Sequence, residues 1–379
     1  MTTTTHPAAA TETSAATPAD LFTALRPDAP AAEVADRVLA ATLGAMELSA
    51  IHLGDRLGWY RALADHGPLT SVELATETGT VERYAREWLE QQAASGYLRA
   101  DLDGPAPRFA LGAGARETLT DVDSTAYLAP LGRFLAASGR VLDDLVDAYR
   151  HGGGVSWERL GADAREAQSA MNRPYFLHAL AQESIPAVPE LDARLRAGAR
   201  VADVGCGEGW SAIGVARQHA GVTVDGYDVD APSVEAARRH AAEADVAERV
   251  RFTTTDVATL GAAVAYDVVM AFECVHDMSD PVAVLSAMRT MASPDGYVLV
   301  VDERADEAFT APADPVQRLF YGFSLLCCLP DGLSAEGGVG TGTVMRPSTL
   351  ARYAREAGFV RLEVLPVEHD MFRFYRLHL

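Results

Sequence analysis

The first candidate for chemistry in this sequence is a histidine at the end of an apolar run. Residues 266–277 read YDVVMAFECVHD, so His276 follows a stretch typical of a buried strand and precedes Asp277. An imidazole changes its protonation close to neutral pH, and it can take the proton of a hydroxyl nucleophile. The alternative is a structural role, in which His276 only caps the helix that follows. Its residue type therefore indicates either a general base or a capping side chain.

A glycine-rich turn is the second candidate. The apolar run RVADV leads into Gly205, Gly207 and Gly209, and a helical pattern begins near Trp210. Glycines let the backbone turn sharply, and they let a ligand lie against peptide N–H groups at the start of a helix. The spacing is G-x-G-x-G, whereas a dinucleotide-binding turn reads G-x-G-x-x-G. The turn predicts a ligand site but does not by itself name the ligand.

Three acidic residues follow the first three apolar runs of this region. Asp203 precedes the first glycine by two residues, where a carboxylate attracts an ammonium group, and Asp228 is placed to hold ribose hydroxyls. Asp256 closes the third run, where its side chain or the next backbone N–H meets an adenine edge. The alternative is that each acid is an ordinary cap at a strand end. Three acids on successive strands favour a nucleoside-containing ligand in the crevice of an open sheet.

A doubly wound α/β domain must position these groups. From about residue 195, short apolar runs alternate with amphipathic helical patterns, which is typical of that fold. The last two runs are joined by only a few residues and are expected to pair antiparallel. The seven expected strands cover 200–205, 222–228, 249–256, 266–272, 296–303, 359–366 and 371–379.

The first third of the chain has a different pattern. Residues 1–32 are rich in Ala, Thr and Pro, which predicts a disordered tail. Residues 33–120 predict helices, one of them capped by Ser71, followed by a hairpin around Asp103 and Gly104, the order of a winged helix. Residues 45–120 carry seven Arg against eleven acidic residues, a net charge of 7 − 11 = −4. A helix that reads DNA needs a basic face, so protein–protein packing is the favoured role.

The composition limits the partners of the whole chain. The formal charge is −21, and all 32 basic residues are Arg, which excludes a Schiff-base lysine and opposes contact with nucleic acid or anionic membranes. Four Cys at 206, 274, 327 and 328 fit neither a disulfide framework nor a CxxC metal site. The first residues lack a signal-peptide pattern, and no long apolar span occurs. We expect a cytoplasmic protein.

Four motifs together resemble the class I S-adenosylmethionine-dependent methyltransferases: VADVGCGEG (201–209), GYDVD (226–230), TTDVA (254–258) and YDVVMAFECVHD (266–277). The resemblance covers about the last half of the chain and is specific for the cofactor. With a winged helix in front, the chain is similar to small-molecule O-methyltransferases of a bacterial branch. It implies an α/β fold with a seven-stranded Rossmann-like sheet and S-adenosyl-L-methionine as cofactor. The implied cofactor-binding residues are Asp203, Gly205, Gly207, Gly209, Asp228, Val229, Asp256, Val257 and Phe272.

The same resemblance implies the catalytic residues. In that family the general base is a histidine in a His-Asp-(aromatic)-Ser-Asp run, which His276 matches, with Met278 at the aromatic position. Of two acidic partners, one corresponds to Asp302 or Glu303, whereas Met345 stands where the second is expected. That departure leaves room for a reaction other than phenol methylation. The helical stretch before the cofactor region is expected to contribute to the substrate pocket, with core packing as the favoured alternative for most of its side chains. The expected pocket residues are Met171, Asn172, Tyr175, Phe176, His276 and Tyr321. The acids near His276 have no recognised metal-site spacing, so no metal site is expected.

The sequence thus predicts a winged-helix dimerisation domain (33–120), a helical connector that lines the pocket (121–190) and a methyltransferase domain (191–379). The expected reaction is methyl transfer to a small organic molecule, at a hydroxyl oxygen, by a homodimer. Two alternatives stay open. One is a non-methylating reaction on the same fold, and the other is a ligand-sensing transcriptional regulator. The arginine-only, alanine-rich composition is typical of GC-rich bacteria and suggests natural-product metabolism.

Overall fold

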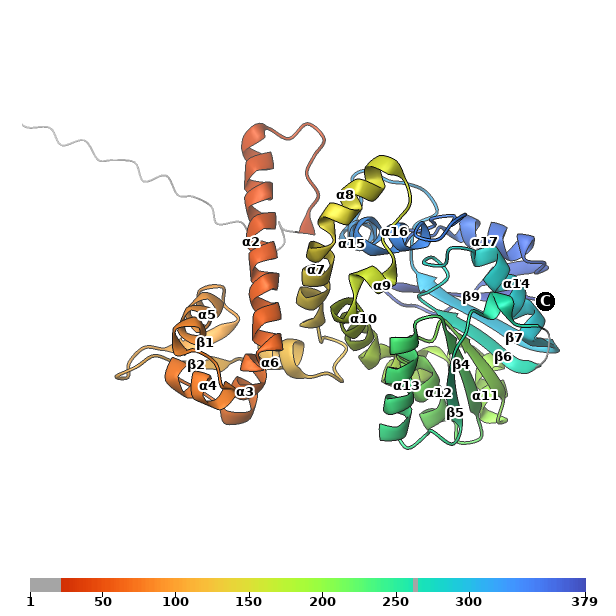
Figure 1. Cartoon of the computed structure of the whole chain (residues 1–379), viewed down its shortest axis with the longest axis horizontal. Coiled ribbons are helices and arrows are strands. Elements are labelled where there is room, and N and C mark those ends of the chain that lie inside the picture. The colour runs from red at the N-terminus through yellow and green to blue at the C-terminus, as the bar shows by residue number, and fades with distance from the viewer. Residues whose placement is uncertain (1–21, 262–264) are drawn as a thin grey trace, which may run out of the picture.

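The computed structural model describes residues 22–261 and 265–379. A small N-terminal domain and a larger α/β body lie on either side of the long helix α2 and the connector helices (Figure 1). Most of the expected tail lies outside the described residues, and α2 begins at Ala31. In the described part of the chain, no helix is both long enough and apolar enough to cross a bilayer.

The N-terminal domain is a helical unit closed by a two-stranded hairpin, as the sequence predicts. Its core is aromatic, because Trp88 packs against both Trp59 and Tyr60 at ring-centre distances of 4.9 Å. One expectation was wrong: Thr70, not Ser71, caps α4, and it forms a reciprocal capping box with Glu73. The elements are α2 (Ala31–Arg56), α3 (Trp59–His66), α4 (Ser71–Thr78), α5 (Glu82–Ala94), β1 (Leu98–Asp101), β2 (Arg108–Leu111) and α6 (Ala113–Thr120).

The connector is helical, and its first helix lies tightly against α2. A side chain at Gly132 of α7 would come within 2.5 Å of the Leu48 carbonyl oxygen, so only glycine allows this close approach. The connector elements are α7 (Pro130–Arg140), α8 (Leu142–His151), α9 (Trp157–Leu160), α10 (Ala162–Pro174), the π-helix η1 (Tyr175–Ser184) and α11 (Pro189–Arg196).

The seven-stranded sheet has the strand order β5-β4-β3-β6-β7-β9-β8. The first five strands in that order are parallel, and β9 is antiparallel to both of its neighbours, as expected. The expected α/β fold is confirmed, although β7 starts earlier than the sequence predicts. The strands are β3 (Arg200–Val204), β4 (Thr223–Asp228), β5 (Val250–Thr254), β6 (Tyr266–Phe272), β7 (Ala292–Glu303), β8 (Arg361–Val364) and β9 (Phe372–His378).

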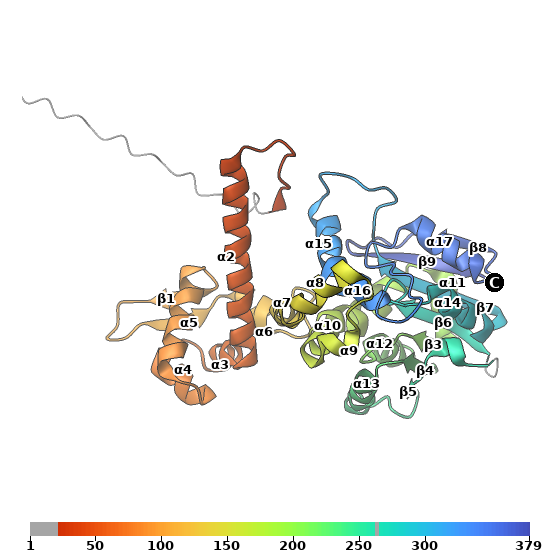
Figure 2. The same cartoon turned by 45° about the horizontal axis from the view of Figure 1, so that its top comes forward.

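Helices cover both faces of this sheet (Figure 2). One apolar cluster joins the sheet to α11, α12, α13 and η1, and a second joins the opposite face to α14 and α17. Strand ends at the carboxyl edge stay uncovered by these layers, and there the connector α10 and the segment η3 approach the sheet. The remaining elements are α12 (Trp210–Gln218), α13 (Ala231–Glu243), η2 (Val257–Thr259), α14 (Pro281–Met291), α15 (Pro315–Phe323), η3 (Ser324–Cys328), α16 (Leu329–Gly332) and α17 (Pro347–Glu356).

Candidate active site

The ends of β6 and β7 bring the expected histidine and its acidic partner together. These strands are parallel neighbours with Phe272 opposite Val301, so the residues that follow them meet at one edge of the sheet. His276 is 2% exposed, and its Nδ1 lies 2.7 Å from Asp302 Oδ1. A buried carboxylate at Nδ1 fixes the orientation of the ring and leaves Nε2 for chemistry.

Glu303 lies beside this pair, and its carboxyl group ionises less readily than that of Asp302. Its Oε2 is 2.9 Å from His276 Nδ1, but the Nδ1 hydrogen is directed at Asp302, and Oε2 has no hydrogen-bond partner. Burial raises the pKa of Glu303 well above its ordinary value. Burial also opposes ionisation of Asp302, but the neighbouring His276 outweighs it and holds the pKa of Asp302 below its ordinary value. Asp302 is therefore the acid that ionises more readily of the two.

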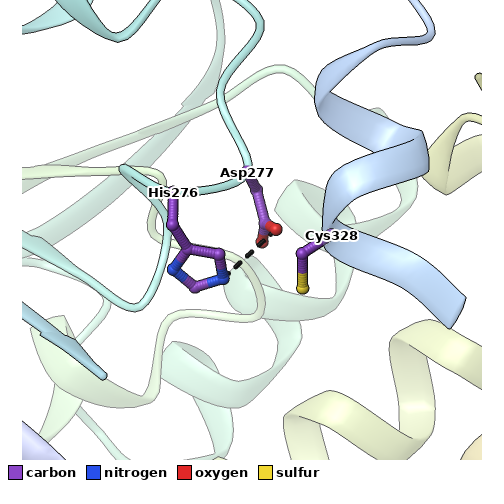
Figure 3. Close-up of side chains that lie close together, drawn as sticks. All are labelled: His276, Asp277 and Cys328. Carbon is purple, nitrogen blue, oxygen red and sulfur yellow. Dashed lines mark ion pairs between the residues drawn. The ribbon is translucent and has the colours of Figure 1, made fainter. Parts of the chain in front are cut away.

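The other ring nitrogen faces Asp277 and Cys328 (Figure 3). Asp277 Oδ1 lies 3.2 Å from Nε2, and Cys328 reaches the same side of the ring from η3. Burial by itself lowers the pKa of His276, but the charges of the surrounding carboxylates outweigh it and raise the pKa well above its ordinary value. A carboxyl group thus lies at each ring nitrogen, an arrangement that favours the imidazolium form of His276. The sequence did not predict Cys328, because only the tertiary fold brings η3 to this strand edge.

Glu273 is a further buried acid that sequence analysis missed. It is a non-glycine residue with a positive φ of 48°, a conformation that the surrounding fold must impose. Its Oε2 accepts a hydrogen bond of 3.3 Å from Gln168 of α10, whereas its Oε1 has no partner. Burial raises the pKa of Glu273 to about 8. The connector therefore closes over an acidic site, with α10 supplying amides at its edge.

The glycine turn after β3 has the shape that a ligand needs. Gly205, Gly207 and Gly209 have φ values of 69°, 52° and 86°, which favour glycine at each position. A Cβ at Gly205 would lie 2.6 Å from Cys274 Sγ, and one at Gly209 would lie 2.5 Å from a Phe252 ring carbon. At Gly207 nothing lies within 4 Å. Two glycines therefore serve packing, and the third presents bare backbone to open space.

Asp228 and Val229 continue this open surface at the end of β4. The Asp228 carboxylate accepts hydrogen bonds from the N–H groups of Gly207 (2.8 Å) and Asp230 (2.9 Å), which fix it beside the turn. Val229 is 70% exposed and is available to pack against a flat ring. The arrangement suits a ribose at Asp228 with its base on Val229.

Asp203 is more deeply buried than the sequence suggests. It is 1% exposed and accepts a hydrogen bond from Ser211 Oγ at 2.5 Å, while its Oδ1 has no partner. Burial raises the pKa of Asp203 to about 7. An unpaired buried carboxylate oxygen beside the glycine turn fits a cationic ligand group, because such a group would lower the cost of its ionisation.

The other expected cofactor residues have visible structural roles. Asp256 accepts a hydrogen bond from the Ala258 N–H at 2.9 Å and caps η2, the strand-end role considered as its alternative. Val257 is buried in η2. Phe272 is buried at the end of β6, where its ring centre lies 5.4 Å from that of Phe176.

The residues expected to line the pocket divide between the strand ends and the core. Asn172 accepts a hydrogen bond of 3.4 Å from Gln168, which also donates to Glu273. Met171 packs against the cluster that contains Cys328, and Phe176 is core. Tyr175 bonds Ser184 at 2.8 Å, and Tyr321 lies 3.4 Å from an Arg346 nitrogen. Met345 is 2% exposed in the cluster under α14 and α17, so an apolar core side chain stands where the family has its second acid.

Comparison with known families decides the class of the larger domain. Residues 195–321 match the family described as a methyltransferase domain. This chain carries a methyltransferase domain. Residues 41–113 match an Rv2258c-like winged HTH domain, so the second half of the expected resemblance is confirmed as well.

Curated relatives of the methyltransferase domain are named as O-methyltransferases. The ubiquinone biosynthesis O-methyltransferase of Alkalilimnicola ehrlichii is 32% identical over 166 residues, which are 43% of this chain and 61% of that protein. The protein of the same name from Ralstonia nicotianae is 29% identical over 175 residues, 46% of this chain and 68% of that protein. The match thus spans less than two thirds of the first relative.

Solved structures with both domains share the fold. Mitomycin 7-O-methyltransferase superposes with a TM-score of 0.68 and 24% identity, covering 92% of this chain and 98% of that one. Human N-acetylserotonin methyltransferase, solved in complex with S-adenosylmethionine, gives a TM-score of 0.65 and 18% identity, covering 93% of this chain and 99% of that one. The likeness extends over the winged helix, the connector and the methyltransferase domain.

Proposed function

We propose that the chain transfers a methyl group from S-adenosyl-L-methionine to a hydroxyl oxygen of a small organic molecule, with His276 as general base. The observation that carries the proposal is the buried His276–Asp302 pair at the edge of the sheet, next to the open glycine turn. The names of the relatives as O-methyltransferases support the same class of reaction.

The residues around the glycine turn suit the proposed cofactor. Asp203 offers an unpaired oxygen to its ammonium group, Asp228 offers a carboxylate to its ribose, and Val229 offers an apolar surface to its adenine. When bound, S-adenosylmethionine supplies an electrophilic methyl group on a sulfonium sulfur.

His276 supplies the proton chemistry of the proposed reaction. The acceptor hydroxyl would replace Asp277 at Nε2, and His276, once neutral, would take its proton as the oxygen lone pair forms the new C–O bond. His276 would keep the proton released by the hydroxyl, and the cofactor would supply the methyl group from its sulfonium, whose positive charge would be lost on transfer. Asp302 stabilises that imidazolium across the 2.7 Å hydrogen bond. Most of the acceleration is expected from alignment of acceptor and methyl group.

The test uses methyl-deuterated S-adenosylmethionine and fractionated small-molecule extract of the source organism, read by mass spectrometry. We expect a labelled product from the wild type and a rate lower by about 10²–10⁴-fold in His276→Ala, the range for loss of a general base. His219→Ala is the matched control, because His219 is also buried but lies at the end of α12. An equal loss in both variants would contradict the base role. Cofactor binding without any labelled product would favour a non-methylating reaction.

We further propose that the chain is a homodimer joined along α2. Apolar residues recur along α2 and its C-cap at alternating spacings of three and four residues when Ala50 is included. They are Leu39, Leu43, Met46, Ala50, Leu53 and Leu57. Each of these leucines and Met46 is exposed, and Met46 is 62% exposed. Apart from Ala50, which is partly buried against the N-terminal core, these positions form an exposed apolar stripe with the spacing of a two-helix seam. A second copy supplies the same stripe and buries both.

A further inference from the structure

We propose that His276, Asp277 and Cys328 form a binding site for a zinc-like divalent cation, and that the cation occupies the nitrogen that the methyl-transfer reaction needs. The site would hold the metal with one imidazole nitrogen, one carboxylate oxygen and one thiolate sulfur, the ligand types that zinc prefers. The inhibitory part of the inference rests on the proposed function, whereas the binding part does not.

The positions of the three ligand atoms suit a small tetrahedral cation. His276 Nε2, Asp277 Oδ1 and Cys328 Sγ all lie within 4.8 Å of one another, and Nε2 is 3.2 Å from Oδ1. Two ligands that each lie roughly 2.0–2.1 Å from zinc at a tetrahedral angle are about 3.3 Å apart. The thiol is carried by η3 and lies no more than 4.8 Å from the other two ligand atoms. Three protein ligands leave the fourth position open.

The surroundings of the three ligands resemble those of a built metal site. Nδ1 of His276 is held by Asp302 at 2.7 Å, the carboxylate–histidine arrangement that orients metal-bound imidazoles. Asp277 Oδ1 is shielded from solvent and has no hydrogen-bond donor, although its distance to Nε2 is that of an ion pair. A carboxylate oxygen left in this state is costly, and a cation would satisfy it. Carboxylate and thiolate together balance the charge of a divalent ion.

The opposite side of the ring is the poorer site for a soft cation. His276 Nδ1, Asp302 and Glu303 also lie within 4.8 Å of one another, but that set has no sulfur. A metal there would have to break the hydrogen bond from Nδ1 to Asp302, which orients the ring. Binding at Nε2 keeps that bond and removes only the proton that faces Asp277.

Metal binding and base catalysis would then exclude each other. A metal on Nε2 occupies the lone pair that must accept the acceptor's proton, and it also holds Asp277 and Cys328 where the acceptor hydroxyl must enter. Zinc is therefore expected to inhibit methyl transfer, and a chelator is expected to restore it. The same competition makes the acceptor and the metal mutually exclusive ligands.

The test is a cobalt titration of the chelator-treated full chain, because a cobalt–thiolate bond gives a near-ultraviolet charge-transfer band without any turnover. Wild type is expected to show the band with one cobalt per chain, and zinc is expected to abolish it. Cys327→Ser is the matched control and should keep the band, since Cys327 is the adjacent buried thiol and lies outside the ligand set. Cys328→Ser should lose the band. Asp302→Asn should weaken cobalt binding by about 10–100-fold, as expected for loss of the carboxylate that orients a metal-bound histidine through its other ring nitrogen.

The possible outcomes distinguish a failure of the proposed metal site from a failure of the proposed methyl transfer. A band that survives in Cys328→Ser, or its absence from the wild type, would overturn the metal site whatever the methyl-transfer assay shows. Zinc inhibition that is reversed by chelator and weakened in Cys328→Ser supports the competition. Full methyl transfer at a zinc concentration that saturates the cobalt site would overturn it. Failure of methyl transfer in metal-free protein would count against the proposed function and leave the binding result standing.

Discussion

At the scale of single residues, the main feature is a histidine with a carboxylate at each nitrogen. Asp302 holds Nδ1, and Asp277 lies at Nε2. The first contact favours catalysis because it orients the ring, but the second keeps the ring protonated. The resting state therefore protects the base with a proton, and catalysis requires that this proton leave before the acceptor hydroxyl arrives.

This protonation predicts the acid limb of the pH–rate profile. Because the pKa of His276 is raised, the neutral base forms only as pH rises through that value, and kcat/KM is expected to rise with it. Asp277→Asn removes one of the charges that raise the pKa of His276, so the limb should move to lower pH. The profile is measured in chelator-treated buffer. A limb that stays in place would show that Asp277 does not control the histidine.

A second prediction concerns Asp203 and folding stability. Its pKa is about 7 in the fold, above its ordinary value, so its contribution to stability is complete at low pH and is lost as pH rises through about 7. Asp203→Asn cannot ionise and still accepts the Ser211 hydrogen bond. Without cofactor, the free energy of unfolding of the variant minus that of the wild type should increase between pH 4 and 7. The increase should be at most about 1.4 kcal/mol per pH unit. Urea unfolding at pH 5 and 8 measures this, and an equal difference at both pH values would contradict it.

At the scale of elements, α10 ties the connector to the cofactor side of the sheet. Arg165 forms a two-pronged ion pair with Asp230, with both distances 2.7 Å and both side chains 12% exposed. Asp230 in turn donates its backbone N–H to Asp228. A change in α10 can therefore reach the carboxylate that is proposed to hold the ribose.

Arg165→Met is expected to weaken S-adenosylhomocysteine binding by about tenfold or more, equivalent to at least 1.4 kcal/mol. The physical reason is that Asp230 loses its buried partner and the turn that carries Asp228 loosens. Isothermal titration calorimetry measures the affinity. Arg159→Met is the control, because its ion pair with Asp144 is exposed and should matter little. Equal affinities for Arg165→Met and the control would contradict a role for α10.

The elements also show what the sequence can and cannot predict. Strands β3 to β9 were predictable because each contains a short apolar run. His276 after β6 and the acids at the end of β7 had to meet once the two strands were parallel neighbours. The Thr70 cap was missed because Thr70 and Ser71 are both good capping residues. Cys328 and Glu273 were missed for another reason. Their roles depend on how η3 and α10 cross the strand ends, and no local spacing encodes that contact.

At the scale of the whole molecule, charge and surface agree with a protein partner for the winged helix. The basic side chains Arg83 and Arg86 of α5 pair with Glu87 and Glu82 of the same helix. The arginines of α5, the helix that would contact DNA in a DNA-binding winged helix, are thus paired with acids of the same helix. The overall charge of −21 also repels nucleic acid. The large exposed apolar surface lies on α2 instead.

The α2 seam predicts the oligomeric state. Wild type should sediment as a dimer, and Leu43→Glu combined with Met46→Glu should give monomers, because two buried charges would face each other across the seam. Val360→Glu is the control, since Val360 is also exposed but lies next to the sheet edge. Analytical ultracentrifugation distinguishes the two masses. A monomeric wild type, or a dimer that survives the double substitution, would contradict the α2 interface.

The glycine contact between α7 and α2 has a mechanical consequence. Because Gly132 lets α7 lie directly on the backbone of α2, the helix that would join two copies is in close contact with the connector that leads to the α/β body (Figure 1). In such a dimer, rotation of one copy about the α2 seam would also displace the connector of the partner copy. The close helix contact at Gly132 would then determine how tightly the movements of the two copies are coupled.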